Sequence, residues 1–174
     1  MQSRARGFSL LELAVVACVL SVLLAVLLNR LTFYQEAAER AQFESTLQAY
    51  KTALQIRLAE LILDRREAEA RTLETGNPAE LMAEKPANYG GDYPASPQSG
   101  TWYFDTSTHE LVYVVNTGER LLLAAGANGP KEAGGPKQLR FKVRVIYQPI
   151  SAPGGKVNGI AGVTLAPGRV YQWP

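Results

Sequence analysis

The residues best suited to chemistry lie near the start of the chain, where one carboxylate, Glu12, interrupts an apolar segment. Residues 8 to 28 are apolar apart from Ser9, Glu12 and Ser21. A helix of that length would be about 31 Å long, which matches the hydrocarbon core of a bilayer. A carboxylate there costs up to about 3 kcal/mol at the bilayer centre and usually has a function. The structural alternative is a shallow glutamate that reaches interfacial water or is protonated.

The neighbours of Glu12 favour a functional interpretation. Arg6 and Gly7 precede Phe8-Ser-Leu-Leu-Glu12-Leu and an unbroken apolar stretch, and this pattern resembles the prepilin signal of type IV pilins and type II secretion pseudopilins. The resemblance implies that prepilin peptidase, a membrane-embedded aspartic peptidase, cuts after Gly7 on the cytoplasmic side and N-methylates Phe8. It also implies that the freed α-amine of one subunit pairs with Glu12 of a neighbour during assembly. At about 4 Å and an effective dielectric near 20, that attraction is about 4 kcal/mol before desolvation is subtracted.

The flanking charges predict how the segment lies in a membrane. Arg4 and Arg6, with no acid among the first seven residues, keep the N-terminus cytoplasmic and send the rest of the chain outward. In the resembled family this means a single pass through the inner membrane with a periplasmic head, which then enters a filament. A cleaved secretory signal is the competing interpretation, but Leu27-Leu28-Asn29-Arg30 offers no small-x-small cleavage site.

Composition excludes other classes of protein. The apolar segment argues against a fully soluble cytoplasmic protein, and the formal net charge of +2 gives no global attraction to nucleic acid. The single cysteine, Cys18, lies inside the apolar segment, so a disulfide scaffold is excluded. Major pilins commonly have a proline near the end of the apolar segment, and Ala25 to Leu31 has none. That departure favours a minor subunit over a major one.

Residues 29 to 75 are predicted to continue the helix as an amphipathic segment. From Leu31 to Glu74 there is no glycine or proline, and Gly76-Asn77-Pro78 provides a stop. One apolar stripe at helical spacing should pack against a head: Phe43, Leu47, Tyr50, Leu54, Leu58 and Leu61. Charged residues of both signs, Glu39 among them, are assigned to a solvated face or to a charged ring that meets neighbouring subunits.

Residues 76 to 174 are predicted to form a β-rich head. Glycine and proline mark residues 75 to 100 as a long surface connection. Strands are then expected at 101–105, 110–115, 120–125, 139–148, 159–165 and 170–173, with the first two joined as an antiparallel hairpin by Thr106 to His109. The predicted fold is therefore α+β: a cytoplasmic leader at 1–7, a transmembrane helix at 8–28, its continuation at 29–75, and an antiparallel sheet packed on that helix. This is also the pilin layout.

One strand of the head is basic on one face. Between Glu119 and Pro174 there are eight basic residues against two acidic ones. In the stretch from Leu139 to Val145, alternation places Arg140, Lys142 and Arg144 on one face of a strand and apolar side chains on the other. The structural interpretation is a half-buried strand with a solvated basic face, and the functional interpretation is a contact with an anion or DNA.

The head shows no pattern for catalysis, and we expect neither an enzyme nor a cofactor. His109 is the only histidine and is expected to face solvent in a turn, and no serine nucleophile motif is present. Calcium needs six to eight oxygens, usually from several clustered carboxylates. The acids after residue 85 are scattered, so no metal site is predicted, although Asp92 and Asp105 are the least implausible ligands.

These patterns lead to one main hypothesis and two alternatives. The chain is predicted to be a structural subunit, minor pilin or pseudopilin, of a type IV pilus or type II secretion filament. Its partners would be other pilin or pseudopilin subunits, prepilin peptidase and the inner-membrane assembly platform. The alternatives are a DNA-binding or adhesive minor pilin that uses Arg140, Lys142 and Arg144, and an anchored periplasmic protein that never polymerises.

Overall fold

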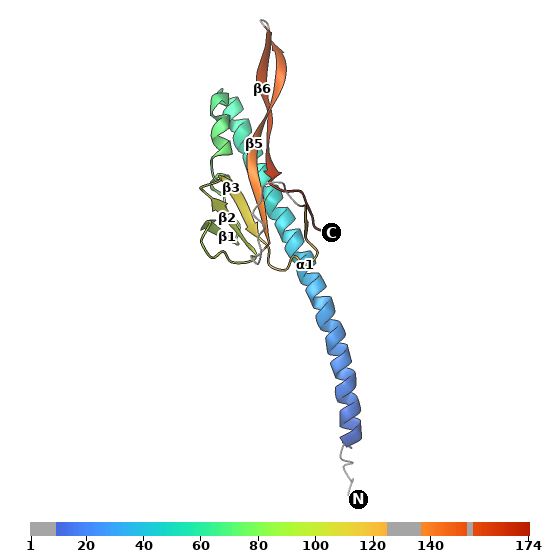
Figure 1. The fold of residues 1–174 in the computed structure, drawn as a ribbon. Coiled ribbons are helices and arrows are strands. Elements are labelled where there is room, and N and C mark those ends of the chain that lie inside the picture. Colours follow the sequence, from blue (N-terminus) through green and yellow to red (C-terminus); the bar gives the residue numbers. More distant parts are fainter. Residues whose placement is uncertain (1–9, 125–136, 153–154) are drawn as a thin grey trace, which may run out of the picture. The chain divides into compact units, whose positions relative to one another are not determined.

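The computed structural model describes residues 10–124, 137–152 and 155–174 (Figure 1). The chain divides into two compact units, Met1–Ala38 and Glu39–Pro174. One helix, α1 (Leu10–Leu63), has residues in both units. The described structure is α+β, as predicted, since α1 is followed by short 3-10 helices and a five-stranded sheet.

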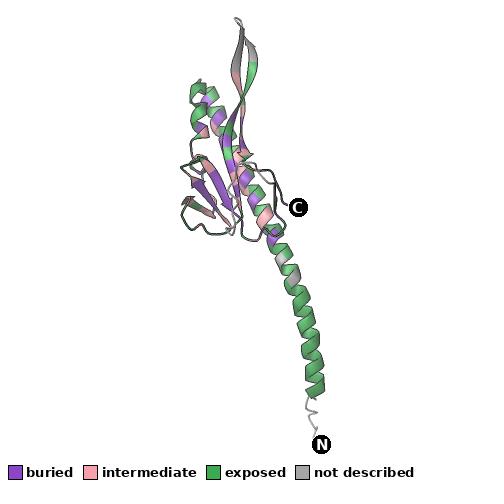
Figure 2. Cartoon of the chain, in the orientation of Figure 1, coloured by how far each residue is buried: buried purple, intermediate pink, exposed green. Residues whose placement is uncertain are grey.

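The N-terminal part of α1 is apolar and exposed. Side chains around its whole circumference are open, as the green ribbon of Figure 2 shows, and Leu23 is 60% exposed. No break occurs in Ala25–Leu31, the stretch that lacks a proline. The predicted helix at 8–28 is therefore observed from Leu10 onward.

The second part of α1 buries the predicted stripe. Phe43, Leu47, Tyr50, Leu54, Leu58 and Leu61 are all buried. Phe43 stacks on Trp102 with ring centroids 5.4 Å apart, and Tyr50 meets the same indole edge to face. Spacing of three and four residues puts these side chains on one side of the helix, so one face of α1 covers the sheet.

The helix ends earlier than the sequence indicates, at Leu63 and not near residue 75. Arg65 adopts a φ of 55°, and the N–H groups of Arg65 and Arg66 donate to the carbonyls of Ile62 and Leu61 at 3.1 and 2.8 Å. This is the Schellman arrangement, which usually has glycine at the left-handed position. Because arginine occupies it here, the prediction of a helix through 29–75 was wrong at its end.

Two 3-10 helices follow within the segment that was predicted as helix and surface connection. They are η1 (Glu67–Glu74) and η2 (Pro78–Leu81). Asn77 caps η2, since its side-chain oxygen accepts a hydrogen bond from the N–H of Ala79 at 3.0 Å. Pro78 at the first position of η2 needs no such partner.

The main sheet has the order β1-β2-β3-β5-β6. Its strands are β1 (Tyr89–Asp92), β2 (Thr101–Asp105), β3 (Glu110–Val114), β5 (Gln138–Ala152) and β6 (Gly155–Pro167). The expectation of a purely antiparallel sheet was wrong, because β1 pairs parallel with β2. A side chain at Gly90 would lie 2.4 Å from the Tyr103 ring, so only glycine lets β1 lie this close, and a glycine-rich stretch gave no strand signal.

The predicted hairpin is confirmed. β2 and β3 pair antiparallel with Asp105 opposite Glu110, and the turn between them is Thr106 to His109. His109 is exposed and has a φ of 54°, so it is a solvent-facing turn residue as expected.

The remaining strands follow the predicted order with different lengths. β5 and β6 form a longer hairpin than predicted, and Figure 1 shows it extending beyond β3. β4 (Leu122–Leu123) and β7 (Tyr171–Gln172) are shorter than predicted and form a separate two-stranded sheet. Trp173, just after β7, packs 5.6 Å from the Phe43 ring and closes the core.

Candidate functional site

The cleavage motif is described only in part. Gly7 and Phe8 lie outside the described residues, and Glu12 lies in the first turn of α1. A carboxylate in the first helical turn is favoured by the partial positive charge of the helix N-terminus. Glu12 is exposed, with Leu11 and Leu13 exposed beside it. The carboxylate of Glu12 therefore lies near the N-terminal end of the apolar part of α1.

The described residues contain one helix whose length and composition would let it cross a membrane. An 18-residue window within α1 has a mean hydropathy of 2.8, and none of that window is buried. An exposed apolar surface of this length is unfavourable in water and favourable in lipid. Length and composition are the observations that support a membrane span here.

The predicted alternation on β5 is confirmed. Leu139, Phe141, Val143 and Val145 are buried, whereas Lys142 and Arg144 are exposed. The structure therefore places Arg140, Lys142 and Arg144 on the outer face of the sheet. Whether this face binds an anion or DNA stays a prediction.

Arg140 differs from its two neighbours because it is already neutralised within the sheet. Its guanidinium lies 2.9 Å from an Asp105 carboxylate oxygen and 3.2 Å from one of Glu110, and it stands over the Tyr93 ring at 5.4 Å. Lys142 and Arg144 form no ion pair within the part of the chain that the structure describes. The available positive charge of this face is thus two cations and not three.

Asp105 is held as a carboxylate by its surroundings. Burial alone would raise its pKa, but hydrogen bonds from the Ser107 side chain, Arg140, and the backbone N–H groups of Ser107 and Thr108 lower the pKa to about 2. These donors occupy the carboxylate oxygens, so Asp105 is poorly placed to bind calcium. Asp92 lies on β1 in register with Phe104, and the described residues include no cluster of three potential metal-ligating side chains.

Glu39 is the residue whose role the sequence interpretation missed. The sequence predicts a solvated face or a charged ring between subunits for it, but its carboxylate accepts hydrogen bonds from the Tyr113 hydroxyl at 3.0 Å and from the N–H groups of Asn116 and Thr117 at 2.7 and 2.9 Å. The Thr117 hydroxyl also donates to it. One carboxylate of α1 therefore holds the end of β3 and the chain that follows.

A sequence signal for Glu39 existed but was weak. Glu39 lies four residues before Phe43, so it is on the same helix face as the apolar stripe. A carboxylate on a buried face requires donors, but those donors are more than 70 residues away in the chain. Only the tertiary fold identifies them.

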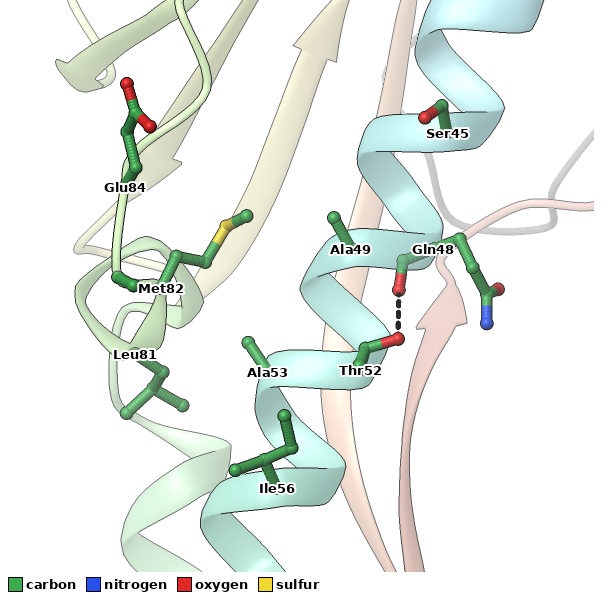
Figure 3. A pocket seen from close by; sticks show the side chains of 10 residues that line it. Ser45, Gln48, Ala49, Thr52, Ala53, Ile56, Leu81, Met82 and Glu84 are labelled. Atoms are coloured by element: carbon green, nitrogen blue, oxygen red, sulfur yellow. Dashed lines mark hydrogen bonds between the residues drawn. The ribbon is translucent and has the colours of Figure 1, made fainter.

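A shallow groove of about 740 Å³ lies between α1 and the end of η2 with the residues that follow it. Figure 3 shows Leu81 and Met82 on one side and Ala49, Ala53 and Ile56 on the other. The Thr52 hydroxyl in its wall donates to the Gln48 carbonyl at 3.0 Å. Such a lining suits an apolar side chain, not a charged cofactor.

Comparison with known proteins gives no relative for this chain. No family model, no curated protein and no solved structure matches it.

Proposed function

We propose that this chain is a subunit of a type IV pilus or type II secretion filament. It is anchored in the inner membrane by α1, with a cytoplasmic N-terminus and a periplasmic head, and is processed after Gly7. The observation that carries the proposal is Glu12 in the first turn of a long apolar helix whose sides are exposed.

The exposed helix gives the physical reason for assembly. Lipid covers the apolar side chains from Leu10 to Leu28 while the subunit is in the membrane. Once the subunit leaves the bilayer, that surface must be covered by the helices of other subunits, because its exposure to water is unfavourable. In such a bundle Glu12 would pair with the freed α-amine of Phe8 from a neighbour, which sets the register between subunits.

A minor subunit is favoured over a major one. The stretch Ala25–Leu31 lacks the proline common in major pilins, and α1 passes through it without a break. The proposed partners are other pilin or pseudopilin subunits, prepilin peptidase and the assembly platform, and no enzymatic activity is proposed.

The first test is the mass and N-terminus of the protein from membranes of cells with and without prepilin peptidase. Peptidase-dependent loss of Met1 to Gly7 with a methylated Phe8 supports the proposal. An intact N-terminus in both preparations would overturn it in favour of an anchored periplasmic protein that never polymerises.

A second test separates assembly from insertion. Glu12→Ala should leave membrane insertion and peptidase cleavage unchanged but sharply reduce recovery of the subunit in sheared filaments. Ser21→Ala is the matched control, because the Ser21 hydroxyl only donates to the Ala17 carbonyl of the same helix at 2.7 Å. Normal incorporation of Glu12→Ala would remove the charge pair from the proposal.

A further inference from the structure

The hairpin of β5 and β6 carries large apolar side chains into solvent. Along β5, buried and exposed residues alternate up to Val145, whose N–H donates to a Glu74 carboxylate oxygen at 2.9 Å where η1 packs beside the strand. Every residue from Ile146 to Pro149 is then exposed. Ile146 is 46% exposed and Tyr147 is 40% exposed, and Figure 1 shows the hairpin extending beyond β3. These side chains are open to contact by another molecule.

Ile146 belongs to a short ridge on the outer face of this hairpin. Because side chains alternate along a strand, Ile146 lies on the same face as Arg144, about 7 Å away along β5. The residues opposite them on β6 are Gly162 and Thr164, which are both small. Beyond the chain neighbours of Gly162, no heavy atom lies within 4 Å of the position that its Cβ would take. The β5 ridge, defined as Arg144 and Ile146, therefore stands higher than the residues opposite it.

The groove between α1 and the end of η2 has the opposite form. The residues that line it from α1 are all uncharged: Ser45, Gln48, Ala49, Thr52, Ala53 and Ile56. Leu81 and Met82 line the facing side, and Figure 3 shows the Met82 side chain pointing toward α1. Ile56 is 56% exposed. The groove is therefore apolar and open to a side chain from outside.

The ridge and the groove carry exposed charges of opposite sign. Glu84 is the only charged residue among the described residues that line the groove, and Arg144 is the cation of the ridge. Within the part of the chain that the structure describes, neither forms an ion pair. Glu84 follows Met82 by two residues, a span of at most about 7 Å, and Arg144 and Ile146 are separated by the same two residues. The two surfaces therefore match in both apolar character and charge.

We propose that the groove of one copy of this chain binds the β5 ridge of a second copy. Ile146 of one copy enters the groove beside Met82 of the other, and Arg144 pairs with Glu84. A second copy is the occupant that charge and spacing favour, because the same unit, Glu39–Pro174, carries both halves of the contact. The inference goes beyond the filament proposal and does not depend on it, since it uses only this unit.

The proposed contact is heterologous, because it joins two different patches of the same chain. A pair of copies therefore keeps one ridge and one groove unoccupied, and further copies add head to tail. The contact is small, so we expect a dissociation constant on the order of 0.1 mM.

The first test measures self-association of the full chain in detergent micelles by sedimentation velocity over a range of concentrations. Ile146→Asp and Ile56→Glu should each weaken association at least about tenfold, because each places a charge in an apolar contact. Val170→Asp is the matched control, since Val170 is an exposed apolar residue beside β7 and should leave association unchanged.

The apolar part of α1 is the same in all these proteins, so association through that part would be equal in all of them. Equal association of the unmodified chain, Ile146→Asp and Ile56→Glu would overturn the proposal. A chain that stays monomeric up to millimolar concentration would also overturn it and leave the groove to a different polypeptide.

Mixing the two variants tests the direction of the contact. Ile146→Asp keeps an intact groove and Ile56→Glu keeps an intact ridge, so the mixture should form pairs with the affinity of the unmodified chain and no larger species. Neither variant alone should form these pairs. A mixture that does not pair would rule out a heterologous contact.

Exchanging the charges tests the ion pair. Arg144→Glu should weaken association by about fivefold, as expected for an exposed ion pair, and Arg144→Glu/Glu84→Arg should restore it. Without that restoration, the pairing of Arg144 with Glu84 would be wrong. Duplex DNA that binds through Arg144 to a chain showing no self-association would overturn the proposal in favour of a nucleic-acid contact.

Discussion

The two parts of α1 have similar backbone structure and opposite surroundings. From Leu10 to Leu28 the apolar side chains are exposed on all sides, whereas from Glu39 to Leu63 one face is covered by the sheet. Leu23 and Leu54 illustrate the difference at 60% and 1% exposed. Both parts are helical, so they differ in the burial of their side chains and not in their secondary structure. The second part is covered within its own unit, whereas the apolar side chains of the first part are exposed.

Two glutamates of this helix, Glu12 and Glu39, also differ in their surroundings. Glu12 is conspicuous in the sequence because apolar residues surround it, whereas Glu39 is inconspicuous among many charges. Glu39 nevertheless accepts four hydrogen bonds within its own unit. Glu39 should therefore affect folding, whereas under the filament proposal Glu12 should affect assembly.

The difference between the two parts of α1 is tested most strongly by making the same Leu→Ala substitution in each part. Leu54→Ala should lower the free energy of unfolding of the Glu39–Pro174 unit by about 2–5 kcal/mol, because it leaves a cavity in the core. Leu23→Ala should leave that free energy unchanged. Denaturant unfolding of the full chain in micelles measures both, since the two tryptophans, Trp102 and Trp173, are buried in this unit. Equal losses of unfolding free energy in the two variants would contradict the conclusion that Leu54 is covered by the sheet while Leu23 is not.

The second prediction compares the glutamates. Glu39→Ala should destabilise the same unit by about 1–3 kcal/mol, because the donors from Tyr113, Asn116 and Thr117 lose their acceptor. Amide exchange at Asn116 and Thr117 should also become faster. Glu12→Ala should change neither measurement, and a loss of head stability in that variant would show that Glu12 is structural.

Acid unfolding sharpens the comparison within the head. The pKa of Asp105 is lowered from 3.8 to about 2 in the folded unit, so its contribution to stability is complete above about pH 4 and is lost as the pH falls toward 2. Asp105→Asn should reduce the slope of stability against pH in that window and leave the slope above pH 5 unchanged. Unfolding midpoints measured across the series check this, and an unchanged acid slope would argue against the Arg140 pair.

The smallest expected effect concerns the end of α1. Arg65→Gly should stabilise the unit by roughly 0.5–1 kcal/mol, because glycine adopts a positive φ without a steric penalty. Asp64→Gly, at the turn position just before, where φ is not positive, should destabilise by a similar amount. Thermal unfolding of both variants gives the comparison, and a destabilised Arg65→Gly would mean that the arginine side chain contributes more than its backbone strain removes.

Much of the fold could be predicted where the signal is periodic. The stripe from Phe43 to Leu61 and the hairpin of β2 and β3 were correct because period and turn residues act over a few positions. The end of α1 and strand β1 were wrong. Arginine in a left-handed cap and glycines in a strand both contradict local preference. The cap is closed by local backbone hydrogen bonds, whereas β1 is held by its pairing with β2.

The candidate sites divide in the same way. The alternation on β5 correctly assigned the faces of Lys142 and Arg144, since side chains of a strand alternate. It could not show that Arg140 is paired, because Asp105 and Glu110 meet it only after β2, β3 and β5 are side by side. The motif at Gly7, Phe8 and Glu12 stays a prediction.

The sequence by itself determined the apolar helix, the face it buries and the strand-rich character of the head, because these depend on spacing along the chain. The tertiary structure alone decided that Glu39 holds the end of β3, that Arg140 is neutralised, and that the Val145 N–H on β5 is bound by the Glu74 carboxylate. Each of these outcomes depends on groups distant in sequence. Hydrogen bonds and ion pairs act over a few ångströms, so only the folded chain brings their partners within range.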